Sequence, residues 1–222
     1  MKYALVTGST SGIGLAIADT LGENGYKVIK TGRSGGDVVA DLSTLEGVNK
    51  ISDAILKENG KINVLVLNAG TTCRKPMKDT TYEDWQEVMN TNLNMPFFLV
   101  QRLFDSIADN GAIIFISSEM SLKPHATSIP YGVSKAAVNM LAQYLVKEFS
   151  PRGIRVNVIC PGFIDTKWQK GKPAWLKEKI EGKIALGKFG QPQVVADMCL
   201  SIIKNGYING AVVVIDGGYD ME

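Results

Sequence analysis

Residues 7–14 read TGSTSGIG and directly follow the apolar run YALVT at 3–7. An apolar run, a glycine-rich turn and a helical pattern over 13–24 predict a strand, a turn and a helix in that order. In such a turn, backbone N–H groups and the positive end of the helix can approach a pyrophosphate, because glycine carries no Cβ. The spacing G-x-x-x-G-x-G also fits a tight turn that binds nothing, since the chain contains 23 glycines.

The same alternation of short apolar runs and helical patterns continues to the end of the chain. Because the runs are apolar nearly throughout, they are predicted to be strands covered on both faces, as in a parallel sheet. After the first strand, further strands are predicted at 27–31, 37–40, 62–67, 112–117, 154–159 and 211–216. Helices are predicted at 13–24, 44–58, 82–108, 131–149 and 192–204. The fold class is therefore α/β, a doubly wound, seven-stranded and mainly parallel sheet with helices on both faces.

No linker or repeat divides the 222 residues, so a single domain over 1–222 is expected. Pro96 is expected to bend or restart the long helix at 82–108, because proline lacks the backbone donor. The irregular segment 161–190 follows the sixth strand. Ligands bind beyond the carboxyl ends of strands in such sheets, so residues 163–190 are a candidate substrate lid. A solvated surface excursion is the alternative.

Composition is that of an ordinary globular protein, with 45% apolar residues, 21% charged residues and a net charge of +2. This balance does not favour a nucleic-acid partner. Cys73, Cys160 and Cys199 are odd in number and far apart, which predicts reduced thiols rather than disulfides or a metal site. The first apolar run is too short for a signal peptide, and no run is long enough to span a membrane. A cytoplasmic protein is expected.

The segment YGVSK places Tyr131 and Lys135 four residues apart at the start of a predicted helix, where they share a face. An ammonium at that distance favours the phenolate, so the pKa of Tyr131 is predicted to lie below its usual value near 10. Such a tyrosine could exchange a proton with an alcohol oxygen.

Six motifs and a terminal VVVIDGG occur in an order that resembles the short-chain dehydrogenase/reductase family over the whole chain. The motifs are TGSTSGIG, LNAG at 67–70, NTNLN at 90–94, ISS at 116–118, YGVSK at 131–135 and PGFIDT at 161–166. The resemblance implies a Rossmann fold and an oxidoreductase that interconverts a carbonyl and an alcohol by hydride transfer from NAD(P).

The resemblance implies four catalytic residues, Asn92, Ser118, Tyr131 and Lys135. Tyr131 would protonate the carbonyl oxygen, and Ser118 would hold that oxygen by a hydrogen bond. Lys135 would hold the nicotinamide ribose and lower the pKa of Tyr131, while Asn92 would anchor a water. The neighbouring Asn90 and Ser117 are one-step alternatives in the alignment.

The resemblance also implies the residues that contact the dinucleotide, in addition to Tyr131 and Lys135. They are Gly8, Ser9, Thr10, Ser11, Gly12, Ile13, Gly14, Arg33, Asp41, Leu42, Asn68, Ala69, Gly70, Pro161, Gly162, Ile164 and Thr166. Asp41 also fits a charge at the N-terminus of the helix predicted from residue 44.

Arg33 determines the expected cofactor preference. An acid that binds the ribose 2′-OH is expected roughly 20 residues after the glycine turn, where this chain has Thr31, Gly32 and Arg33. An arginine there can clamp a 2′-phosphate, so NADP is predicted over NAD. None of residues 9–11 is basic, although NADP-preferring members often have a second basic residue there. Asp37 folding into the ribose pocket, or Arg33 as a plain turn residue, are the alternatives.

The expected function is an NADPH-dependent reductase of a small-molecule ketone or a 3-oxoacyl compound. The alternatives are an NAD-dependent alcohol dehydrogenase of the same family and a dinucleotide-binding sensor. A dehydratase or epimerase is disfavoured because such members usually have a longer region after the sixth strand. The family often assembles through its long helices, here 95–108 and 131–149, so a homotetramer or dimer is expected.

Residues 165–188 contain seven lysines against three acids. They could steer an anionic substrate such as an acyl carrier or CoA thioester, or form a solvated lid helix. Phe163, Trp168 and Trp175 could close over an apolar substrate or serve packing and subunit contacts. Residues 71–73 border the expected cleft. His125, the only histidine, is expected to be a hydrogen-bonded surface group.

Overall fold

The structure, a computed structural model, describes residues 1–57, 60–124 and 128–221. Within them one seven-stranded sheet has the order β3-β2-β1-β4-β5-β6-β7, and every strand pair is parallel. The strands are β1 (Lys2–Val6), β2 (Tyr26–Gly32), β3 (Val38–Val39), β4 (Ile62–Leu67), β5 (Ile107–Ile116), β6 (Arg155–Pro161) and β7 (Val212–Ile215). The predicted doubly wound α/β class is confirmed.

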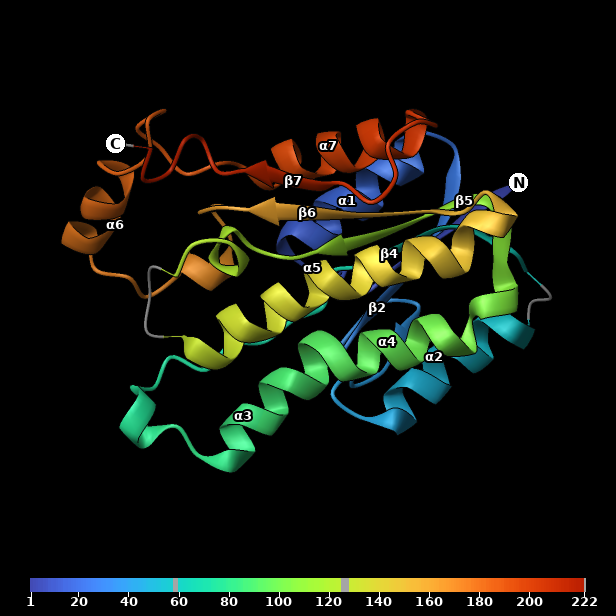
Figure 1. The fold of residues 1–222 in the computed structure, drawn as a ribbon, viewed down its shortest axis with the longest axis horizontal. Coiled ribbons are helices and arrows are strands. Elements are labelled where there is room, and N and C mark those ends of the chain that lie inside the picture. Colours follow the sequence, from blue (N-terminus) through green and yellow to red (C-terminus); the bar gives the residue numbers. More distant parts are fainter. Residues whose placement is uncertain (58–59, 125–127, 222) are drawn as a thin grey trace.

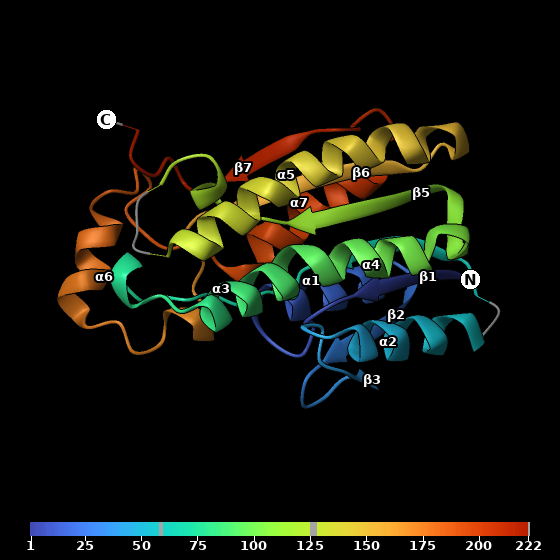
Figure 2. The ribbon, with the colours of Figure 1, turned by 60° about the horizontal axis from the view of Figure 1, so that its bottom comes forward.

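Helices cover both faces of the sheet (Figures 1 and 2). One face packs against α1 (Gly12–Glu23) and α7 (Pro192–Lys204). The other face packs against α2 (Leu45–Lys57), α4 (Met95–Arg102) and α5 (Ile129–Phe149). Alternate residues of a strand point to opposite faces, so both layers need apolar residues and the strands read as continuous apolar runs.

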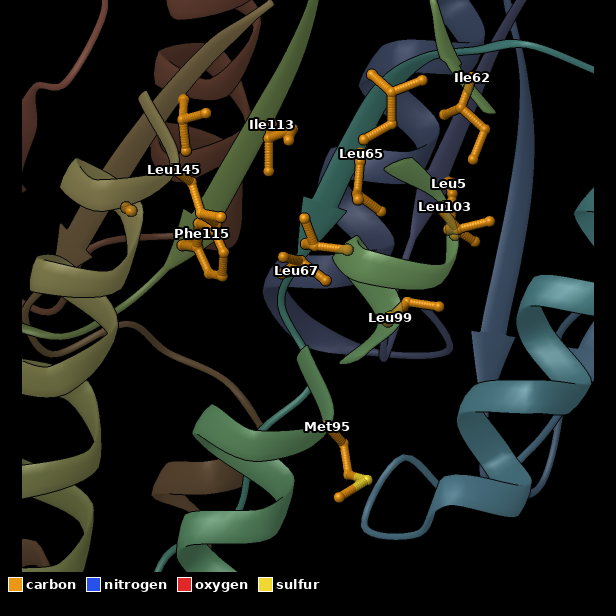
Figure 3. Close-up of a cluster of buried hydrophobic side chains, with 14 of the residues drawn as sticks. Leu5, Ile62, Leu65, Leu67, Met95, Leu99, Leu103, Ile113, Phe115 and Leu145 are labelled. Carbon is orange, nitrogen blue, oxygen red and sulfur yellow. The ribbon is translucent and has the colours of Figure 1, made fainter. Parts of the chain in front are cut away.

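Figure 3 shows the core between the sheet and the layer that contains α4 and α5. Leu65 and Phe115 from the sheet and Leu99 from α4 are at most 1% exposed. Burying each such side chain contributes about 1.5–3 kcal/mol, so this layer holds the carboxyl ends of β4 and β5 in fixed positions.

The strand order reverses between β1 and β4. The chain runs outward from β1 to β3 and then returns to place β4 on the other side of β1. The loops after β1 and β4 therefore diverge at the carboxyl edge of the sheet and leave a crevice, which is the usual ligand position in such folds. TGSTSGIG follows β1 and LNAG spans the end of β4.

The long helix predicted at 82–108 consists of several pieces. It contains α3 (Tyr82–Met89), a π-helical turn η2 (Asn90–Asn94) and α4, with Pro96 in the first turn of α4. The restart at Pro96 is confirmed. The helix prediction for residues 107–108 is wrong, because β5 begins at Ile107.

An irregularity in β5 explains that error. The pairing of β4 with β5 shifts register between Ile62 and Val64, and Asn110 adopts a φ of 61°. The first half of the strand cannot be recognised from the sequence, because the polar residues of this bulge interrupt its apolar pattern.

The segment after β6 lies beyond the carboxyl ends of the strands and includes α6 (Ala174–Glu181) (Figures 1 and 2). The segment was predicted to be irregular, but it has a small apolar cluster of its own, formed by Ile180, Ile184, Phe189 and Tyr219. Short 3₁₀ turns are η1 (Met77–Asp79), η3 (Phe104–Ser106), η4 (Glu119–Ser121), η5 (Ser150–Arg152) and η6 (Lys167–Gln169).

The three cysteines are free thiols and are buried, as predicted. Among the described helices, none combines the length and the apolar character that a bilayer crossing requires.

Candidate active site

A cleft of about 710 Å³ lies at the carboxyl edge of the sheet. It brings together residues from the loops after β1, β2, β4, β5 and β6 and from the start of α5. Almost all of the residues predicted from the sequence line it. The exceptions are Ser9, Gly14 and Asn92, which do not line the cleft.

The glycine turn forms a backbone cradle at one end of the cleft. Gly8 and Gly12 adopt positive φ values of 62° and 58°, which favour glycine. A Cβ on Gly8 would lie 2.9 Å from the Cα of Ala69, and one on Gly14 would overlap the carbonyl oxygen of Gly8. The turn therefore needs glycine at these positions, and its open backbone fits a pyrophosphate at the N-terminus of α1.

Asn68 and Thr7 fasten the first loop to the fourth strand. The Thr7 Oγ1 accepts hydrogen bonds from the backbone N–H groups of Asn68 at 2.9 Å and Ala69 at 3.1 Å. The Asn68 Nδ2 donates to the carbonyl oxygens of Thr7 and Gly8. These bonds hold the two loops of the crevice as one unit.

Ser9 was predicted to contact the dinucleotide, but its side chain faces β2. Its Oγ donates to the Val6 oxygen at 2.7 Å and accepts from the Thr31 N–H at 2.9 Å. Ser9 is fully buried, and its hydroxyl ties the glycine turn to the second strand. Thr10 and Ser11 line the cleft with Ile13.

Arg33, Asp41 and Leu42 line the cleft from the loops after β2 and β3, and Arg33 also borders an adjoining hollow with Arg74 and Trp168. A Cβ on Gly32 would lie 2.6 Å from the Thr10 side chain and 3.1 Å from the Gly35 carbonyl oxygen, so a larger residue there would require Thr10 to shift. Asp41 accepts a hydrogen bond from the Ser43 N–H, which lowers the pKa of its carboxyl, and Arg33 lowers it further.

Asp37 does not enter the ribose pocket, one of the alternatives drawn from the sequence. Its carboxylate accepts from the Lys30 N–H at 2.8 Å, and the residue lies outside the cleft. As the sequence indicates, no helix separates β2 from β3.

Ser118, Tyr131 and Lys135 converge at the other end of the cleft. Tyr131 lies in the first turn of α5, and Ser118, two residues after the end of β5, is close enough to lower the pKa of the Tyr131 hydroxyl. The neighbouring Ser117 donates instead to the Lys135 carbonyl oxygen. The geometry therefore favours Ser118 over Ser117 as the serine beside the tyrosine.

Burial sets the protonation of Tyr131 and Lys135. It raises the pKa of Tyr131 to about 12, although Ser118 acts in the opposite direction. The prediction of a lowered tyrosine pKa is therefore wrong for the ligand-free cleft, because desolvation of the phenolate outweighs the other influences. The Lys135 Nζ donates to the Ile116 oxygen at 2.7 Å, and burial lowers the pKa of the ammonium to about 8.

Asn92 lies in η2 behind the cleft and is only 2% exposed. Its Oδ1 accepts from the Thr71 N–H, and its Nδ2 donates to the Thr71 oxygen and to the Ser134 Oγ. The amide thus joins the loop after β4 to α5, close to Lys135, and does not line the cleft.

Pro161, Gly162, Ile164 and Thr166 line the cleft along the start of the lid. Thr166 crosses over the glycine turn, because its Cγ2 lies 3.3 Å from the position that a Cβ on Gly12 would take. The lid therefore begins directly above the cradle.

The lid aromatics have different positions. The Trp168 ring lies 6.1 Å from the Tyr131 ring and lines the cleft, as Phe163 does. Trp175 is 64% exposed and lies outside the cleft. Thr71 and Thr72 border the cleft as expected, whereas Cys73 does not. His125 lies outside the described residues.

Sequence reasoning missed Arg74 and Lys172, which also line the cleft, and the acid Glu87. Arg74 directly follows residues 71–73, which were expected to border the cleft, so the sequence could have indicated it. Lys172 was counted only as one of the lid lysines, because no pattern distinguishes it from its exposed neighbours.

Comparisons with known proteins show the family of the chain. Residues 2–177 match the family model described as short chain dehydrogenase. The chain is 34% identical to 3-oxoacyl-[acyl-carrier-protein] reductase FabG of Aquifex aeolicus, over 98% of this chain and 96% of the relative. It is 33% identical to the protein of the same name from Pseudomonas aeruginosa, over 100% and 98% of the two chains.

A solved short chain dehydrogenase from Burkholderia cenocepacia in complex with NADP superposes with a TM-score of 0.92. It is 28% identical, and 98% of this chain and 97% of that chain are covered. A blue fluorescent protein from a metagenomic library in complex with NADPH also gives a TM-score of 0.92 at 27% identity, with 98% and 97% covered. By its motifs, its fold and these relatives, the chain belongs to the short-chain dehydrogenase family of NAD(P)-dependent oxidoreductases.

Proposed function

We propose that this protein reduces the carbonyl group of a small molecule to an alcohol with NADPH. The observation that carries the proposal is the convergence of Ser118, Tyr131 and Lys135 at one end of a cleft whose other end is the glycine cradle. The substrate is a ketone or a 3-oxoacyl compound, in line with the printed names of the reductases from Aquifex aeolicus and Pseudomonas aeruginosa.

The dinucleotide, when bound, supplies the hydride. Tyr131 supplies the proton, because a hydroxyl with a raised pKa stays protonated at neutral pH and can donate to the developing alkoxide. Ser118 holds the carbonyl oxygen beside that hydroxyl. Lys135 is an ammonium below about pH 8, and its Nζ donates to the Ile116 oxygen. Asn92 keeps Thr71 and α5 in place.

The cofactor assignment to NADP rests on Arg33, which lines the cleft beside Gly32, where an acid would be expected for NAD. The planar guanidinium suits a 2′-phosphate. Around it, the residues proposed to contact the dinucleotide are those of the glycine turn and of the loops after β2, β3, β4 and β6 that line the cleft. Ser9 and Gly14 support the turn from behind.

We also propose a single domain with a lid over residues 163–190, a cytoplasmic location and a homo-oligomer. The three buried free thiols support a reducing compartment. Exposed apolar side chains on the outer face of α5 support an interface between copies, namely Val133, Met140 and Tyr144, at 43%, 54% and 67% exposure.

The test is a panel of ketones and 3-oxoacyl compounds with NADPH or NADH, followed by nicotinamide absorbance. The proposal expects oxidation of NADPH by at least one carbonyl compound and a lower kcat/KM with NADH. Tight binding of NADPH with no turnover on any compound would favour the sensor instead. Faster oxidation of alcohols with NAD would favour the dehydrogenase.

A further inference from the structure

Two positive side chains reach the substrate end of the cleft. Arg74 lies in the loop after β4, and Lys172 lies between η6 and α6. Both line the cleft together with Ser118 and Tyr131. Neither is used by the proposed proton transfer or by the dinucleotide contacts.

The turn η6 holds both cations in place. The Arg74 Nη2 donates to the Trp168 carbonyl oxygen at 3.3 Å, and the Lys172 Nζ donates to the Gln169 Oε1 at 2.6 Å. Gln169 is buried, and the Trp168 ring contacts the Tyr131 ring. The exposed Arg74 and the half-buried Lys172 therefore bond to consecutive residues of a turn that lies beside the proposed proton donor.

Among the residues that the structure describes, neither Arg74 nor Lys172 forms an ion pair, and the cleft acids Asp41, Glu87 and Glu119 pair with neither. Lys172 is half-buried, with its Nζ 5.8 Å from the centre of the Phe163 ring.

The electrostatics follow from this arrangement. Burial lowers the pKa of the Lys172 ammonium, and the nearby charge of Arg74 lowers it further. At Tyr131, burial is the largest influence and raises the pKa; Glu119 also raises it, and Arg74 lowers it. An anion bound between the two cations would relieve their repulsion, and it would lie near the Tyr131 hydroxyl.

We propose that Arg74 and Lys172 form an anion subsite, so that the preferred substrate is an oxo acid with its carboxylate or phosphate a few bonds from the carbonyl. This inference rests on the proposed carbonyl reduction. A carrier thioester places its nearest phosphate at the far end of the long pantetheine arm, which does not match a subsite beside Tyr131. Within the 3-oxoacyl class, the free acid therefore fits better than the thioester.

Matched substrate pairs test the subsite. The panel is acetoacetate against its methyl ester and its pantetheine thioester, and dihydroxyacetone phosphate against dihydroxyacetone, all with NADPH. The wild type is expected to favour the anionic member of at least one pair by about tenfold or more in kcat/KM. The carboxylate and phosphate pairs show which anion is bound. A wild type that prefers the neutral ester or thioester would overturn the proposal.

Variants assign the preference to these two residues. Arg74→Gln and Lys172→Gln should each lower the anionic-to-neutral ratio of kcat/KM by about tenfold, while Arg74→Lys retains part of it. Lys179→Gln is the matched control, because Lys179 is an exposed lysine of the same lid outside the cleft. Equal losses on both members of a pair would show a structural role and refute the subsite.

A binding measurement separates this inference from the proposed function. Butyrate and methylphosphonate, which cannot be reduced, should quench the tryptophan fluorescence of the wild type and the Lys179→Gln variant and should lose about tenfold in affinity in Arg74→Gln. If no carbonyl compound is turned over but this loss is seen, the reductase proposal fails and the anion subsite stands. If ketones are reduced without any charge discrimination or anion binding, the subsite fails and the reductase proposal stands.

Discussion

Lys135 is a charge that the fold holds almost out of water, with 4% of its surface exposed. Its pKa of about 8 lies below the ordinary value of 10.5, so the unfolded chain binds more protons between these two values. The cost of burying the ammonium is therefore present below about pH 8 and disappears as the pH rises toward 10.5.

The expected result is a pH-dependent difference between the wild type and Lys135→Met. Urea unfolding at pH 7 and pH 9.5 should show that the wild type gains stability relative to the variant at the higher pH, by up to about 2 kcal/mol. Both pH values lie below the raised pKa of Tyr131, so its ionisation contributes little. Parallel pH dependence in the two proteins would contradict a depressed lysine pKa.

In the proposed function, Arg33 carries the preference for NADP over NAD. Arg33→Ala should weaken NADPH binding by about 10- to 100-fold, because a charge-assisted contact to the 2′-phosphate is lost. NADH binding should change by less than about threefold, because NADH has no phosphate there. Calorimetric titration of both cofactors measures this, and equal losses would remove Arg33 from the phosphate site.

At the residue scale, sequence spacing predicted which side chains meet but not how their environment acts on them. Tyr131 and Lys135 share a helix face, as four-residue spacing requires, and both line the cleft. Their pKa values depend on burial by strands and loops distant in the sequence, which the spacing does not contain. Ser9 illustrates the same limit, because only the pairing of β1 with β2 turns its hydroxyl toward Thr31.

The glycine turn is the element proposed to hold the pyrophosphate of the dinucleotide. Gly14→Ala would place a methyl group against the Gly8 oxygen and the Asn68 amide. The expected cost is about 1–3 kcal/mol in unfolding free energy, together with weaker dinucleotide binding.

Gly22 in the same helix is the matched control. A Cβ there meets no atom within 4 Å, so Gly22→Ala should stabilise the protein by about 0.4–1 kcal/mol through the unfolded state. Chemical denaturation of both variants checks the pair. If Gly14→Ala were as stable as Gly22→Ala, the close packing of the turn would not hold.

At the element scale, the regular strands and helices could be predicted, and the irregular ones could not. β4 at 62–67 and α7 at 192–204 agree with their apolar patterns residue by residue. The first half of β5 was missed because its bulge breaks the period. A lid helix was only an alternative without bounds, because α6 packs on the small cluster around Ile180 and Phe189 rather than on the main core.

At the scale of the whole molecule, the cleft depends on loops that only the sheet order brings together. The family resemblance predicted this assembly, since its motifs follow β1, β4, β5 and β6. It did not predict Arg74 and Lys172, because their meeting at η6 is a property of the lid in this chain.

The outer face of α5 also belongs to this scale. Light scattering should give the mass of a tetramer or dimer. The double variant Met140→Glu and Tyr144→Glu should shift the mass toward that of the monomer, because the new carboxylates of neighbouring copies would be buried against one another in the interface. A wild-type monomer at micromolar concentration would overturn the proposed interface. The far-ultraviolet circular dichroism of the variant should stay unchanged, because both side chains are exposed in the single chain.

Tyr131→Phe tests the central proposal most directly. Turnover of NADPH with the best carbonyl substrate and NADPH affinity should be measured on the same preparation, with Tyr144→Phe from the exposed face of α5 as the control. If Tyr131 is the proton donor, kcat falls by about 100- to 10,000-fold while the NADPH affinity stays within about threefold of the wild type. A Tyr131→Phe variant that keeps most of its turnover would contradict the account.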